Sequence, residues 1–64
     1  MNALPFTTLR LTNKYREEGG QWFFSDRNLA CARSVLVDLI REEPSRDWHL
    51  ECRGTQADWH RWQD

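Results

Sequence analysis

The sequence has little of several features that define common protein classes. Its 64 residues contain only two cysteines, Cys31 and Cys52, which are too few for a disulfide-stapled miniprotein. No stretch approaches the roughly 18 consecutive apolar residues of a membrane-spanning helix. Residues 1–11 lack the basic and then apolar segments of a signal peptide. We therefore expect a cytoplasmic protein without a membrane segment.

The sequence also has no large excess of positive or negative charge. Nine basic and ten acidic side chains give a net charge of −1, so the chain has no overall positive field for nucleic acid. Lysine occurs once, and the other basic residues are arginines, which suit planar, bidentate or stacked contacts. Disordered chains contain few aromatic residues, whereas this chain contains four Trp, three Phe and one Tyr. We expect residues 1–64 to form a single compact domain.

Motifs of the common enzyme classes are absent. There is no nucleophile elbow, zinc-protease helix motif, P-loop or dinucleotide-binding glycine motif. The soft metal ligands match no zinc spacing; they are Cys31, His49, Cys52 and His60. Cys31 falls early in a predicted helix, where thiols can become reactive, but no base lies at a useful spacing. We therefore expect a protein that is not an enzyme and that binds neither a metal nor another cofactor.

Residue patterns predict a β-hairpin followed by a helix. Residues 6–12 show the period-two pattern of a half-buried strand, and residues 21–25 fit a second strand with Trp22 facing the core and Phe23 facing outward. A helix is predicted for residues 26–43, since Pro44 disfavours helical geometry just before it. Its apolar face would cover the sheet and consists of Leu29, Ala32, Leu36, Leu39 and Ile40.

The C-terminal part predicts two more strands. Residues 47–53 alternate again, with three side chains facing the core: Trp48, Leu50 and Cys52. Gly54-Thr55 fits a two-residue turn that would pair Leu50 with Trp59 in a fourth strand over residues 56–64. The alternative for this last segment is a short helix capped by Thr55.

These elements predict a two-layer α+β fold of order β-β-α-β-β. One helix packs on one face of a four-stranded, mainly antiparallel sheet. A right-handed connection through the helix makes the second and third strands parallel to each other. The first strand then lies between them, which gives the strand order 2-1-3-4.

This topology would bring acidic side chains to one end of the molecule. The first hairpin turn, the end of the helix and the start of the third strand meet there; they carry Glu17, Glu18, Glu42, Glu43 and Asp47. Glu42 and Glu43 oppose the helix dipole, and such a departure from a local rule can mark function. We expect this acidic end to dock on a basic or nucleic-acid-binding site of a partner protein, with Trp62 as an aromatic anchor.

In its small size, its lack of a catalytic motif and its mixed acidic surface, the chain resembles the small proteins that phages encode to block host machinery, including anti-CRISPR inhibitors. This resemblance is one of general character and involves no aligned residues. It implies a protein-binding module that inhibits its partner by occupying a site, including a site for nucleic acid.

The alternative functional surface is the sheet face away from the helix. Alternation places aromatic and basic side chains there that suit base stacking and phosphate contacts: Arg10, Lys14, Phe23, His49, Arg53 and His60. Single-stranded nucleic-acid binding is therefore a second hypothesis. A homodimeric structural subunit that buries this face is a third.

Overall fold

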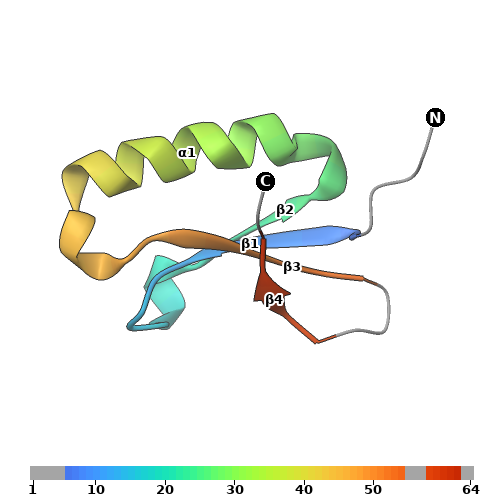
Figure 1. The fold of residues 1–64 in the computed structure, drawn as a ribbon, viewed down its shortest axis with the longest axis horizontal. Helices are drawn as coiled ribbons and strands as arrows, with labels where there is room; N and C mark the ends of the chain where they lie inside the picture. The colour runs from blue at the N-terminus through green and yellow to red at the C-terminus, as the bar shows by residue number, and fades with distance from the viewer. Residues whose placement is uncertain (1–5, 55–57, 63–64) are drawn as a thin grey trace.

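The computed structural model describes residues 6–54 and 58–62, and its elements follow the predicted order (Figure 1). The strands and the helix are β1 (Thr8–Thr12), β2 (Trp22–Ser25), α1 (Leu29–Glu42), β3 (His49–Arg53) and β4 (His60–Arg61). Three 3₁₀ turns connect them: η1 (Glu18–Gly20), η2 (Asp26–Asn28) and η3 (Pro44–Arg46). Among these residues no helix has the length and apolarity needed to cross a membrane.

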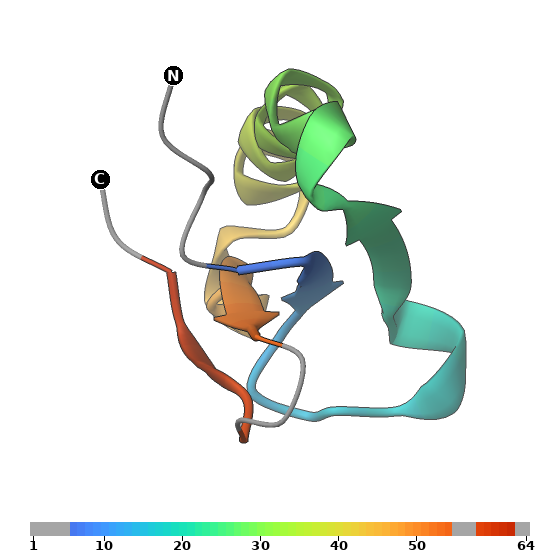
Figure 2. The same cartoon turned by 90° about the vertical axis from the view of Figure 1, so that its right-hand side faces the viewer.

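The sheet has the predicted order β2-β1-β3-β4, and each neighbouring pair is antiparallel. The helix α1 lies over one face of the sheet, and no described helix lies over the other (Figure 2). The predicted α+β fold, with four strands and one helix, is therefore confirmed. We call the uncovered side the outer face.

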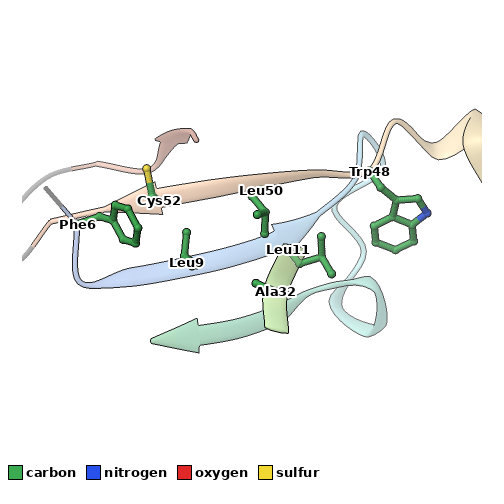
Figure 3. Packing of buried hydrophobic residues seen from close by; sticks show 7 residues of the cluster. All are labelled: Phe6, Leu9, Leu11, Ala32, Trp48, Leu50 and Cys52. Carbon is green, nitrogen blue, oxygen red and sulfur yellow. The ribbon is translucent and has the colours of Figure 1, made fainter. Parts of the chain in front are cut away.

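The core lies between α1 and the two central strands. Register pairs Leu9 with Cys52 and Leu11 with Leu50, so apolar side chains of β1 and β3 share the face toward α1. The buried cluster, shown in Figure 3, consists of Phe6, Leu9, Leu11, Ala32, Trp48, Leu50 and Cys52. Ala32 is fully buried, and its small side chain lets the backbone of α1 approach the strands closely.

Two side chains expected in the core are more exposed than predicted. Ile40 is 44% exposed. The 14 residues of α1 extend about 21 Å, whereas a five-residue strand extends about 17 Å, so the last helical turn overhangs the sheet. Trp22 is 42% exposed because β2 is an edge strand, although its ring lies 5.7 Å from that of Trp48.

The predicted register of the fourth strand is wrong. Cys52 pairs with His60 and Glu51 with Arg61, so the two-residue turn at Gly54 is replaced by a longer connection whose residues 55–57 lie outside the described part. The shift relative to the predicted pairing is an odd number of residues, which exchanges the two faces of the strand. Two tryptophans change places as a result. The side chain of Trp62 packs against the core, and the backbone N–H of Trp62 donates to Leu50 O at 2.9 Å.

The end of β1 holds a buried hydroxyl that makes no hydrogen bond to the described residues. Thr12 is fully buried, and its Oγ1 has no partner there. Because an unsatisfied buried hydroxyl is costly, Thr12→Val is expected to raise the free energy of unfolding by about 1 kcal/mol. Urea unfolding measures this, with the partly exposed Thr8→Val as a matched control. A Thr12→Val protein no more stable than the parent would contradict the prediction.

Candidate functional site

A buried carboxylate lies at the centre of the outer face. Glu51 on β3 is directly opposite Arg10 on β1 and is only 6% exposed. Arg10 donates from Nε to Glu51 Oε1 at 2.9 Å. Arg16 donates from Nη2 to Oε2 at 2.6 Å and from Nη1 to Oε1 at 3.2 Å. Arg16 therefore binds the carboxylate in the bidentate manner that makes charge-assisted hydrogen bonds strong and directional.

A tight turn after β1 positions Arg16 for this contact. Arg16 has a left-handed backbone with φ of 54°, which costs a residue other than glycine roughly 1–2 kcal/mol. Asn13 accepts two bonds, from Tyr15 N–H at Oδ1 (2.9 Å) and from Arg16 N–H at its carbonyl oxygen (3.2 Å). Gln21 Nε2 donates to Arg16 O at 3.0 Å. These bonds and the ion pair with Glu51 together hold the strained conformation.

The charge of Glu51 is stabilised by its neighbours. Burial alone raises the pKa of its carboxyl, but hydrogen bonds from Arg16, Arg10 and His49 outweigh burial and lower the pKa from 4.5 to about 2. His49 Nε2 lies 3.3 Å from Glu51 Oε2, and its Nδ1 lies 2.9 Å from the carbonyl oxygen of Asp47. The carboxylate is therefore ionised at neutral pH and orders the basic side chains around it.

Next to this ion pair, two arginines stack on a tryptophan. The guanidinium carbons of Arg10 and Arg53 lie 4.3 and 4.8 Å from the centroid of the Trp59 ring, within cation–π range. Phe23 on β2 lies 6.1 Å from the same ring and is 63% exposed. We call these four residues the Arg–Trp cluster. It joins β1, β2 and β3 to the segment before β4.

The structure brings together most of the basic and aromatic residues predicted for the outer face. Arg10, Phe23 and Arg53 lie in the Arg–Trp cluster, and His49 contacts Glu51. Lys14 instead lies beyond the end of β1, with Nζ 5.3 Å from the ring of Tyr15.

His60 lies on the opposite side of the sheet from the predicted one. It pairs with Cys52 across β3 and β4 and therefore shares its face, with Nε2 3.3 Å from Cys52 Sγ. Burial raises the pKa of the Cys52 thiol, so the thiol keeps its proton at neutral pH. The exposed Cys31 is separate from this pair. Within the described residues no three His, Cys, Asp or Glu side chains converge as a metal site.

The acidic end is partly neutralised by one arginine. Arg46 in η3 makes ion pairs with both Glu17 and Glu43. Lys14 N–H donates to Arg46 O at 3.0 Å, which ties η3 to the chain after β1. The C-terminus of α1, η3 and η1 consequently lie at the same end of the molecule (Figure 1). Two acidic side chains at this end, Glu42 and Asp47, are exposed; the side chain of Glu18 lies outside the described part.

Trp59 lies on the outer face and not in the core, where its predicted pairing with Leu50 would place it. A cross-strand charge pair was the available signal, because Glu51 opposite Arg61 favours the observed register over the predicted one. That register also places Arg61 on the outer face. Trp62, predicted as the aromatic anchor for a partner docked at the acidic end, instead packs against the core, with the Arg33 guanidinium 5.5 Å from its ring.

Comparison of this chain with known protein families, with curated proteins and with solved structures found no match.

Proposed function

We propose that this chain is a non-enzymatic module that binds a protein partner through the Arg–Trp cluster of its outer face. The observation that carries the proposal is the stacking of Arg10 and Arg53 on Trp59, beside the exposed ring of Phe23. Tryptophan and arginine are the residues most enriched among those that dominate binding energy at protein interfaces. Side chains that are already ordered lose less entropy on binding, so the cluster is suited to high affinity.

Charge indicates the chemistry of the partner. Among residues 6–54 and 58–62, the outer face carries one carboxylate, Glu51, and four guanidinium groups: Arg10, Arg16, Arg53 and Arg61. The arginines therefore exceed the charge that Glu51 compensates. A partner with an apolar spot flanked by carboxylates would complement Phe23 and the surrounding arginines. The acidic end is a weaker candidate for the binding surface than the outer face, since Arg46 already binds Glu17 and Glu43 there.

Reversing one charge tests the proposal. Arg53→Glu is expected to weaken partner binding by at least about tenfold, because Arg53 is exposed and contacts Trp59 rather than the core. The measurement is affinity capture from a host lysate on immobilised wild-type and variant proteins, followed by titration of the captured partner.

The matched control is the double variant Glu42→Lys/Glu43→Lys, which reverses two exposed charges at the acidic end. It should retain the partner. The opposite pattern, with binding lost in the double variant and kept in Arg53→Glu, would place the interface at the acidic end. The phage-inhibitor hypothesis adds that the captured partner is a host protein that binds nucleic acid.

Single-stranded nucleic acid is a second candidate ligand, favoured by the exposed ring of Phe23 among arginines. Bases stack on such rings while guanidinium groups contact phosphates. Binding of a fluorescent oligonucleotide at low salt, lost in Phe23→Ala and at high salt, would support this function. An oligonucleotide that leaves the signal unchanged at low salt would exclude it.

A further inference from the structure

β2 is an edge strand that pairs with no second strand among the described residues and whose own residues lack the usual protections of charge and proline. The sheet order leaves β2 paired with β1 alone. Its four residues, Trp22–Ser25, contain no charge and no proline, and Trp22 and Phe23 are 42% and 63% exposed. Natural edge strands are normally shielded by charged side chains, prolines, bulges or a covering segment, since unpaired backbone groups attract other strands. An unshielded apolar edge is therefore expected to be paired when the protein works.

The ladder between β1 and β2 shows which backbone groups face the open edge. Asp26 N–H donates to Thr7 O at 3.1 Å, and bonded pairs alternate along an antiparallel ladder. Phe24 and Trp22 consequently form the hydrogen-bonded pairs with β1, opposite Leu9 and Leu11. The N–H and C=O groups of Phe23, and of the residues two before and two after it, point away from β1 toward the open edge.

We propose that a second copy of this chain pairs with β2, antiparallel and around a two-fold axis at Phe23. Two identical edge strands that pair side by side in one sheet are antiparallel when the two-fold axis is normal to the sheet. This axis does not turn either sheet over, so the outer faces of both copies lie on the same side. Phe23 then exchanges both of its outward backbone bonds with the second copy's Phe23. Gln21 lies opposite the second copy's Ser25, and these residues also direct their backbone groups outward.

Charge complementarity supports a second copy as the occupant. In this register the chain just after β2, with the exposed Arg27, lies beside the chain just before the second copy's β2. That segment carries the carboxylate of Glu17. Its Oε1 pairs with Arg46 of the same chain, but the side chain stays 42% exposed and can therefore accept a second basic partner. Symmetry repeats this pairing of opposite charges at both ends of the interface. The two Phe23 rings meet at the two-fold axis, so the two Arg–Trp clusters lie next to each other on one shared outer face.

The opposite edge of the sheet is a poorer template for pairing. β4 has only two residues and carries the charge of Arg61. A short, charged edge resists the addition of a strand. The proposed assembly is therefore a closed dimer with one continuous eight-stranded sheet, twice the four strands of one copy, and not an open chain of subunits.

The test compares Phe23→Lys with Val37→Lys. Both replace an exposed apolar residue, 63% and 45% exposed, with the same charge, but Val37 lies on α1 away from the edge. Sedimentation equilibrium over a roughly hundredfold range of concentration reports the assembly state by mass action. We expect wild type and Val37→Lys to move from 7.7 kDa toward twice that mass. Phe23→Lys places like charges directly opposite each other and should weaken the dimer at least about tenfold.

Hydrogen exchange of the outward amides provides a second readout. Amides of Phe23 and Ser25 should gain protection as the wild-type dimer forms. A monomer over the whole range, a dimer equally strong in Phe23→Lys, or protection that appears only when a different protein is added would overturn the proposal. Arg53→Glu keeps β2 intact and is expected to dimerise normally. Failure of partner binding and failure of dimerisation are therefore separate results.

Discussion

Glu51→Gln is expected to lower the free energy of unfolding at neutral pH by about 3 kcal/mol. Each pKa unit corresponds to about 1.4 kcal/mol, and the pKa of Glu51 falls from 4.5 to about 2 on folding. The amide keeps the shape of the side chain but leaves Arg10 and Arg16 without their buried counter-charge. Removing one partner of a buried ion pair is destabilising because the other charge stays desolvated.

The same variant should lose a component of the pH dependence. The folded-state pKa of Glu51 lies below its unfolded value, so its stabilisation is fully present above pH 4.5 and is lost as the pH falls toward about 2. The stability difference between wild type and Glu51→Gln should therefore shrink progressively through that window. Urea unfolding at a series of pH values measures both effects.

The control for this prediction is Glu42→Gln, which removes an exposed carboxylate of α1. Its stability should stay close to that of wild type at every pH, since exposed charges contribute little. A constant difference between wild type and Glu51→Gln from neutral pH down to pH 2 would show that the carboxylate does not stabilise the fold through its charge.

Trp62→Ala is expected mainly to reduce stability, and Trp59→Ala mainly to reduce partner binding. Trp62 is partly buried against the core, so its removal should cost about 2 kcal/mol of unfolding free energy. Trp59 lies on the outer face between Arg10 and Arg53, so its removal should reduce partner affinity by about thirtyfold and change stability much less. Urea unfolding and partner titration measure the two effects.

These two variants are controls for each other, because they remove the same ring from positions three residues apart. They also test the register of β4. If Trp59→Ala were the more destabilising variant and Trp62→Ala the one that loses the partner, the pairing of Cys52 with His60 would be contradicted, and the register predicted from the sequence would be restored.

Local patterns were sufficient to predict the elements and their order. The spacing of apolar residues from Leu29 to Leu39 identifies the helix, and Pro44 limits its C-terminal end. Period-two alternation identifies β1 and β3, whose core side chains are fixed by the pleat. The connection rules for a helix between two strands then leave few topologies, and the observed strand order is one of them.

The candidate site could be predicted only in part. Arg10, Phe23 and Arg53 follow from strand alternation, which places them on the outer face. Arg16 lies outside any strand and reaches Glu51, which is 35 residues away in the chain, only because a left-handed turn redirects its side chain. No short-range pattern encodes such a contact.

The sequence by itself determined which segments form strands and helix, because hydrophobic periodicity is a local property of the chain. Only the tertiary structure decided which way β4 faces, since its register depends on contacts with β3 rather than on its own two residues. A shift by an odd number of residues reverses every side chain of a strand. That choice puts Trp62 against the core and Trp59 beside Arg10, and so determines which tryptophan is available to a partner.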